Sequence, residues 1–206
     1  MSKIEIKKEL DNNQAAILLV PNIEYDDVIV DMARQLSGKK ICYVTLNKTY
    51  SAIKELLELN HVDVKNIIFI DGITKNVKNI ADIDDCHFVD SPVKVTELSK
   101  NLSTLLKQDF DYLVFDSITN LFTYQAKSSV EYFVQTLVSM LEERNCRGVF
   151  FALKRSKSDI YSPIIEIKQS DIFQQREDLP SEGLDLFASR MSEGIALIDI
   201  ADDRSK

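Results

Sequence analysis

The chain has 206 residues, 45% of them hydrophobic, which is enough for one domain with a sizeable core but cramped for two. Its 33 acidic and 25 basic residues give a formal net charge of -8, which disfavours nucleic acid as the main partner because such binding depends on Lys and Arg. The first ten residues contain no apolar signal segment, and no apolar run approaches the roughly 20 residues of a membrane span. We therefore expect a single soluble domain over residues 1–206, located in the cytoplasm, with its three isolated cysteines reduced.

Short apolar runs alternate with segments of helical period along the first 153 residues. The runs predict buried strands, and the segments between them place apolar residues three and four apart, as in helices packed on a sheet. In chain order the predicted elements are strand Ala15–Val20, helix Asp26–Leu36 stopped near Gly38, strand Ile41–Leu46, helix Tyr50–Asn60, strand Ile67–Ile70, short strand Cys86–Val89, a helix capped by Thr96, strand Tyr112–Phe115, a long helix opened by Ser128 or Ser129, and strand Gly148–Leu153. This alternation favours an α/β fold, a three-layer α/β/α domain with a mostly parallel central sheet.

The pattern loosens after residue 153. Residues 154–193 carry polar side chains with only short apolar runs, so we expect a loop-rich, mobile excursion in which a hairpin is one option. Gly194–Ile200 predicts a closing strand, and residues 201–206 form a charged tail.

The turn after the first predicted strand is informative because ligands in open α/β sheets bind at the carboxyl ends of strands. A phosphate-binding loop needs glycines, whose backbone N–H groups wrap the phosphates, and then Lys and Ser or Thr at the helix start. This turn has no glycine, and Pro21 removes a donor. Its carboxylates would repel a triphosphate, although acidic residues at a helix N-terminus also favour the helix dipole. The positions of this degenerate site are Pro21, Asn22, Glu24, Asp26 and Asp27.

The strand that precedes Asp116 and Ser117 has the form of a Walker B strand. Its apolar residues end in an Asp that can hold Mg²⁺ through water, so these two residues are candidates for a residual metal or nucleotide contact. The pattern alone has low specificity, and the alternative is an Asp116 that caps a turn or bonds to Ser117.

Residues 12–153, with Gly194–Ile200 as a matching final strand, resemble the RecA superfamily and in particular its KaiC-like ATPases, which are abundant in archaea. The resemblance comes from the order of elements and from two stretches, KICYVTLNKTYSAIKEL at 40–56 and DYLVFDSITNLFTY at 111–124. It implies a glycine-rich Walker A loop where residues 21–27 stand, and a pair of water-activating glutamates after the second strand. The matching positions here are Asn47 and Lys48. An amide cannot take a proton from water, and a lysine ammonium is an acid near neutral pH.

These two departures predict a pseudo-ATPase that lacks Walker A, has no cofactor and no catalytic residues, and acts as a protein-interaction or regulatory module in signal transduction. Its expected partner is a protein, either a second copy in a homo-oligomer or an active RecA/KaiC-like paralogue. The alternative is a nucleotide sensor or ATPase with an unconventional phosphate site that binds ATP and magnesium. In that case Lys48 or Lys154 would replace the P-loop lysine, and Asp116 would hold the metal.

Other polar groups give weaker signals. Lys154 and Arg155 stand at a strand's carboxyl end, where contact with an anionic ligand or an acidic neighbouring subunit competes with a solvated loop. Neither histidine, His61 or His87, has a partner at metal-ligand spacing. Asp82, Asp84, Asp85 and His87 form an acidic cluster with Cys86 that could bind a cation, but a solvated loop is favoured, so no metal is predicted. A hydrolase triad has no support because no G-x-S-x-G elbow occurs.

Overall fold

A computed structural model describes residues 5–90, 95–154 and 194–200 of the chain. Within these residues seven strands form one sheet in the order β4-β3-β2-β5-β6-β1-β7, and every pairing is parallel. The strands are β1 (Ala15–Pro21), β2 (Ile41–Thr45), β3 (Ile67–Asp71), β4 (Cys86–Phe88), β5 (Tyr112–Asp116), β6 (Arg147–Lys154) and β7 (Ile195–Asp199). The predicted α/β class is confirmed, and the described sheet is parallel throughout.

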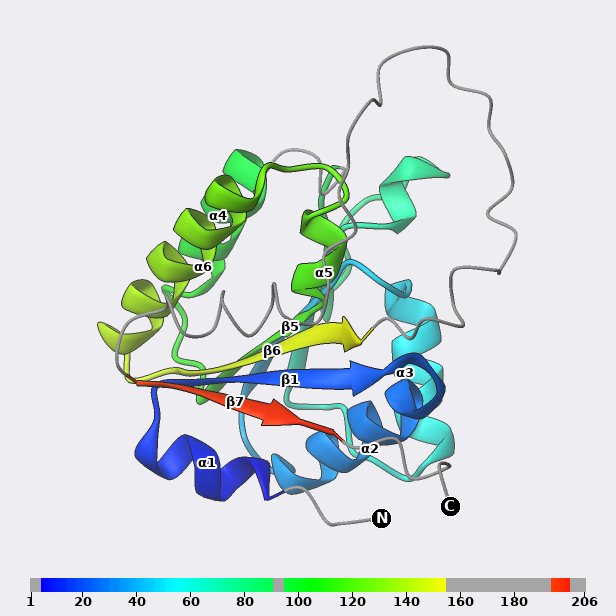
Figure 1. The fold of residues 1–206 in the computed structure, drawn as a ribbon. Helices are drawn as coiled ribbons and strands as arrows, with labels where there is room; N and C mark the ends of the chain where they lie inside the picture. The colour runs from blue at the N-terminus through cyan, green and yellow to red at the C-terminus, as the bar shows by residue number, and fades with distance from the viewer. Residues whose placement is uncertain (1–4, 91–94, 155–193, 201–206) are drawn as a thin grey trace.

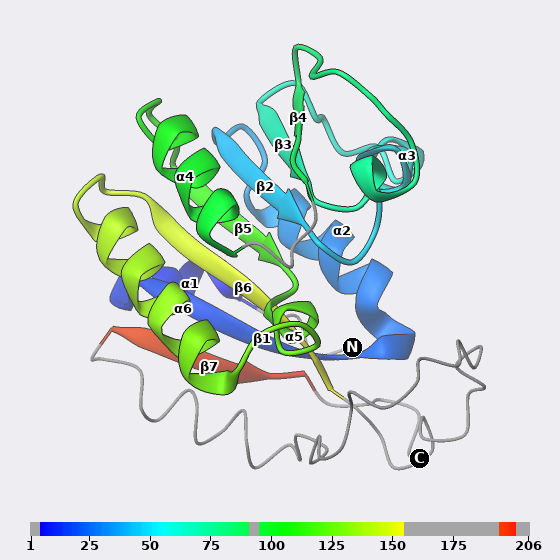
Figure 2. The ribbon, with the colours of Figure 1, turned by 90° about the horizontal axis from the view of Figure 1, so that it is seen from above.

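Helices cover both faces of the sheet, which gives the three layers seen in Figure 1. One face carries α1 (Ile6–Asn12), α2 (Tyr25–Gln35) and α3 (Tyr50–Leu59), and the other carries α4 (Val95–Leu105), α5 (Ile118–Leu121) and α6 (Lys127–Glu142). Two short 3₁₀ helices, η1 (Asn22–Glu24) and η2 (Thr74–Asn76), follow β1 and β3. Seen from above in Figure 2, α4 and α6 lie over the sheet, with β4 and β7 at its two edges.

The core consists of two layers because successive strand residues point to opposite faces. In β1, Ile17 and Leu19 pack with α4 and α6, whereas Leu18 and Val20 pack with α1, α2 and α3. All seven residues of β1 are buried, as expected for a strand inside a parallel sheet covered on both faces.

The predicted helix starts needed correction at two places. Helix α4 begins at Val95 and contains Thr96, so Thr96 does not cap it. Helix α6 begins at Lys127 after the N-cap residue Ala126, so Ser128 and Ser129 lie inside the helix. Gly38 has a positive φ of 77° just beyond α2, which confirms it as a stop signal.

Helix α1 was not predicted, although Ile6 and Leu10 have the four-residue spacing of a helix face and are both buried. The helix is tied to the sheet by Arg147 of β6, whose Nη1 donates to the carbonyls of Leu10 and Asn13, each at 2.6 Å. The excursion expected at 155–193 and the tail at 201–206 lie outside the described residues.

The outer edge of β4 is occupied by the turn that precedes it. The N–H and C=O groups of Cys86 both bond to Ile83, at 3.2 and 3.0 Å. The N–H of Phe88 donates to the Asp82 carboxylate at 2.8 Å. The N–H and C=O groups of Cys86 and the N–H of Phe88, which point away from β3, therefore already have partners.

Within the described part of the chain, none of the helices combines the length and apolar character that crossing a bilayer requires.

Candidate functional site

Asp116 ends β5 in the middle of the carboxyl edge of the sheet. It stands in register with Thr45 of β2 on one side and Phe151 of β6 on the other. Its side chain shares a face with Val114, which belongs to the layer under α2 and α3. The residue is 0% exposed, so its carboxyl group depends on protein partners for hydrogen bonds.

Two tyrosine hydroxyls supply those bonds. Tyr25, the first residue of α2, donates to Oδ1 of Asp116, and Tyr43 of β2 donates to Oδ2 at 3.0 Å. Both tyrosines are buried. Tyr25 packs edge-on against Phe151 with ring centroids 5.6 Å apart, and Tyr43 lies at the same distance from Phe69. Aromatic packing therefore fixes both hydroxyls on the carboxyl group.

The electrostatics of this cluster are those of a buried acid with neutral donors. Burial raises the pKa of Asp116 to about 6, while the Tyr25 and Tyr43 hydrogen bonds and the Lys48 ammonium act to lower it. Burial and then the Asp116 carboxylate raise the pKa of both tyrosines, so their hydroxyls stay protonated and remain donors. Asn47 and Ser117 also act on the Tyr25 hydroxyl and oppose its pKa rise.

The loop after β2 is held against this cluster from outside. The Nζ of Lys48 lies 2.6 Å from Oδ1 of Asp26 in the first turn of α2, with both side chains partly exposed. The Lys48 carbonyl accepts a hydrogen bond from the buried Thr45 hydroxyl, and the Leu46 carbonyl accepts one from the Asn120 side chain. The predicted positions Asn47, Lys48, Asp26 and Asp116 are therefore brought together.

The other predicted positions lie around the rim or outside the site. Pro21 ends β1, and the exposed Asn22 and half-buried Glu24 belong to η1, with the exposed Asp27 beyond them on α2. Lys154 pairs with Asp199 of β7 at 2.7 Å. Arg155 lies outside the described residues.

The acidic stretch before β4 is engaged internally. Asp82 binds His87 Nδ1 at 3.0 Å and the Phe88 N–H, and Asp85 accepts from Tyr50 and Lys54. Although burial opposes the change, the hydrogen bonds from Lys54 and Tyr50 lower the pKa of Asp85. Over residues 5–90, 95–154 and 194–200, the His, Cys, Asp and Glu side chains form no group of three that could hold a metal.

Two features at the carboxyl ends of the strands were not predicted from the sequence. Tyr25 and Tyr43 were not singled out as partners of Asp116. Asp71 was not predicted as a site residue, but its buried carboxylate accepts from the backbone of Tyr50, Ile73 and Thr74 and from the Thr74 hydroxyl. The only signals were a lone aromatic residue, Tyr25, in the acidic segment where α2 begins, and an acid, Asp71, at a strand end.

The parallel sheet, its two helical layers and the acid at the carboxyl end of β5 together define an α/β domain of the RecA-like fold. A solved structure with this arrangement is that of a KaiC-like protein from the hyperthermophilic archaeon Pyrococcus horikoshii. The two match with a TM-score of 0.52 and 13% sequence identity over 94% of this chain and 75% of that one, a likeness that establishes the fold alone. No family model matches the sequence, and no curated protein matches it.

Proposed function

We propose that the chain is a noncatalytic RecA/KaiC-like domain, a pseudo-ATPase, that acts as a protein-interaction or regulatory module. The observation that carries the proposal is the state of Asp116. Its side chain is buried, and both carboxyl oxygens accept hydrogen bonds from tyrosine hydroxyls. A carboxylate that holds Mg²⁺ through water needs space for that water beside an oxygen, and Tyr25 and Tyr43 take up both positions.

The turn after β1, where a phosphate-binding loop would stand, supports the same proposal. The turn at residues 21–27 offers no glycine and carries Asp26 and Asp27 at the start of α2. The two lysines that could replace a P-loop lysine are already paired, Lys48 with Asp26 and Lys154 with Asp199. These residues do not fit a magnesium-bound nucleotide, and no catalytic step follows from them.

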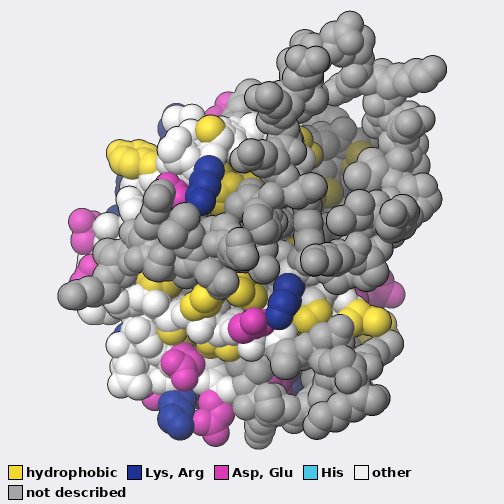
Figure 3. Space-filling model, in the orientation of Figure 1, with side chains coloured by type: hydrophobic (Ala, Val, Ile, Leu, Met, Phe, Trp, Pro, Cys, Tyr) yellow, Lys and Arg dark blue, Asp and Glu magenta, His cyan; other side chains and the backbone are white. Residues whose placement is uncertain are grey.

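A protein is the partner class that this proposal favours. A RecA-like domain without nucleotide keeps the edge through which such domains stack, so the expected partner is a second copy or an active paralogue. The described surface facing the viewer in Figure 3 shows Lys and Arg scattered among Asp and Glu, with no continuous basic area. Together with the net charge of -8, this favours protein over nucleic acid.

Isothermal titration with ATP and Mg²⁺ tests the loss of nucleotide binding. We expect no binding tighter than millimolar. The variants for comparison are Asp116→Ala, which alters the buried acid, and Asp109→Ala, which alters an exposed one at the opposite end of β5. A micromolar signal that D116A abolishes and D109A keeps would overturn the proposal.

The lysine pairs give a second arm to this test. If the alternative hypothesis of an unconventional nucleotide site were correct, Lys48→Ala or Lys154→Ala would abolish the ATP-binding signal. Under the present proposal neither variant changes the heat of titration. Size-exclusion chromatography with light scattering, alone and mixed with an active paralogue, then measures association directly. A strictly monomeric protein that forms no complex in the mixture would contradict the interaction role.

A further inference from the structure

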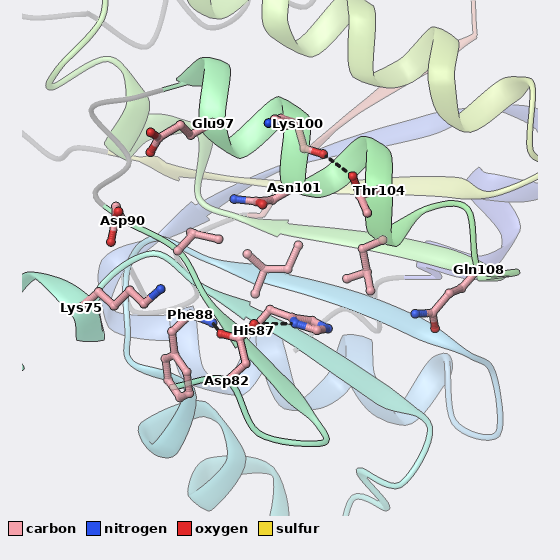
Figure 4. Close-up of a pocket in the computed structure, with 13 residues that line it drawn as sticks. Lys75, Asp82, His87, Phe88, Asp90, Glu97, Lys100, Asn101, Thr104 and Gln108 are labelled. Atoms are coloured by element: carbon pink, nitrogen blue, oxygen red, sulfur yellow. Dashed lines mark hydrogen bonds and ion pairs between the residues drawn. The ribbon is translucent and has the colours of Figure 1, made fainter. Parts of the chain in front are cut away.

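A groove lies on the other side of the sheet from Tyr25, between α4 and the β3–β4 edge (Figure 4). Its volume is about 510 Å³, within the range of roughly 300–1,000 Å³ typical of small-molecule sites. None of the residues that line it belongs to the Asp116 cluster. An inference about the groove is therefore independent of the proposed function.

The groove has an apolar floor and a rim that carries charges of both signs. Ile70, Val89 and Leu105 form the floor, and all three are buried in the layer under α4 and α6. Figure 4 shows charged side chains of the rim on α4 and, across from it, on η2 and the segment around β4. They are the carboxylates of Asp82, Asp90 and Glu97 and the ammonium groups of Lys75 and Lys100. Because acids and bases are nearly balanced, net charge alone does not select an anion.

Three of these charges already interact within the protein. Asp82 binds His87 Nδ1 at 3.0 Å and accepts from the Phe88 N–H at 2.8 Å. Although burial opposes the change, these bonds and the nearby charges, that of Lys75 among them, lower the pKa of Asp82. Asp82 therefore stays ionised and attracts Lys75. Glu97 also has an interaction partner.

The remaining two charges, on Asp90 and Lys100, are opposite in sign and are not joined to each other. Asp90 follows β4 and Lys100 is on α4, and both residues are exposed. In the described part of the chain, neither the Asp90 carboxylate nor the Lys100 ammonium group takes part in an ion pair. The groove thus presents one unpaired charge of each sign beside an apolar floor.

We propose that the groove between α4 and β4 binds a zwitterionic small molecule, an α-amino acid with a large apolar side chain. Its ammonium group contacts Asp90, its carboxylate contacts Lys100, and its side chain lies on the floor residues. Charge-assisted hydrogen bonds orient the two charged groups of such a ligand, and apolar contact adds affinity. An amine or an acid of the same shape would leave either Lys100 or Asp90 without a contact, so the zwitterion is favoured over both.

Phenylalanine and three analogues test the proposal, because each analogue lacks one feature. Phenethylamine lacks the carboxylate, hydrocinnamate lacks the ammonium group, and glycine lacks the apolar side chain. Each is titrated at neutral pH into the ¹⁵N-labelled full chain and followed by two-dimensional NMR. We expect millimolar phenylalanine to give saturable shifts at the amides of Ile70, Val89 and Leu105. Phenethylamine and hydrocinnamate should each bind about fivefold more weakly, as expected for the loss of one exposed charge contact, and glycine should not saturate.

Two variants assign the charges to their contacts. Asp90→Asn should weaken phenylalanine binding about fivefold without weakening hydrocinnamate, which has no ammonium group. Lys100→Gln should weaken phenylalanine by a similar factor without weakening phenethylamine, which has no carboxylate. The matched controls are Asp109→Asn and Lys65→Gln, which make the same changes at exposed positions outside the groove and should leave the affinity for phenylalanine unchanged.

Several outcomes would overturn the proposal. Absence of saturable shifts at the floor residues would do so directly. If hydrocinnamate bound as tightly as phenylalanine, the contact with Asp90 would be wrong, and equal affinity for phenethylamine would exclude the contact with Lys100. Equal affinity for glycine would exclude the role of the apolar floor. A groove variant that behaved as its control does would show that its charge makes no contact with the ligand.

Discussion

The hydroxyl of Tyr43 on β2 donates to Oδ2 of Asp116 on the adjacent strand β5 at 3.0 Å. Tyr43 stands opposite Val114 in the strand register, so Asp116 is its diagonal neighbour on the same face of the sheet. Strand register therefore fixes this bond. The partner of the other oxygen, Tyr25, comes from a position 91 residues away in sequence.

Removing the Tyr43 hydroxyl should destabilise the protein in a pH-dependent way. We expect Tyr43→Phe to lower the free energy of unfolding by about 2 kcal/mol near pH 8, because a buried carboxylate loses a donor. Near pH 4.5 the loss should be smaller, since Asp116 is then protonated. Urea unfolding at both pH values measures it. The control is Tyr132→Phe, which alters a residue that is 73% exposed. Equal losses at the two pH values would contradict the assignment.

Asp116 itself should make the protein less stable as pH rises. The pKa of Asp116 is about 6 in the folded chain against an ordinary value of 3.8, so between these values only the folded state keeps the proton. Stability therefore falls as pH rises through this window, by about 3 kcal/mol in all. Asp116→Asn removes the effect, so the stability of D116N relative to wild type should increase from pH 4 to pH 7. Asp109→Asn serves as the surface control, and a difference that does not change with pH would refute the prediction.

The ion pair between Lys48 and Asp26 should contribute little to stability. Both side chains are partly exposed, 35% for Lys48 and 48% for Asp26, so solvent screens the attraction. A double-mutant cycle with Lys48→Met and Asp26→Asn should give a coupling of about 0.5 kcal/mol. The coupling should diminish in high salt. A coupling several times larger that resists salt would show that the pair is more strongly shielded than this geometry indicates.

Arg147 should control the docking of α1. Its guanidinium donates to the carbonyls of Leu10 and Asn13 at the end of that helix. Arg147→Met keeps much of the side chain's apolar volume and removes both bonds, so we expect faster amide exchange in Ile6–Asn12 with little change in the central strands. Hydrogen-exchange mass spectrometry measures this. Lys39→Met, at a partly exposed lysine, is the control, and unchanged exchange in α1 would contradict the anchoring role.

The strands were predictable because a sheet buried on both faces requires continuous apolar runs. The run Ala15–Val20 was predicted within a residue of the observed β1, and the order of elements led to the RecA-like fold. Helix starts were less predictable. Ser128 and Ser129 are typical capping residues, but α6 begins before them after Ala126, without a side-chain cap.

The candidate site was predictable only in part. Asp116 was found because it ends an apolar run, and Lys48 because the resemblance places it where the family has a water-activating glutamate. The bond from Tyr25 depends on the angle at which α2 leaves the sheet, which no local pattern encodes. Tyr43 could have been paired with Asp116 by two-residue alternation, but only once the β2–β5 register was known.

The turn before β4 has a consequence for how the molecule behaves at high concentration. Sheets with a free edge can template the addition of a strand from another chain. Along β4 most of the outward backbone groups are already bonded, because Ile83 binds both backbone groups of Cys86 and Asp82 accepts from the Phe88 N–H. An incoming strand would have to break those bonds before forming its own, so this end of the sheet resists the edge-to-edge growth that leads to fibrils.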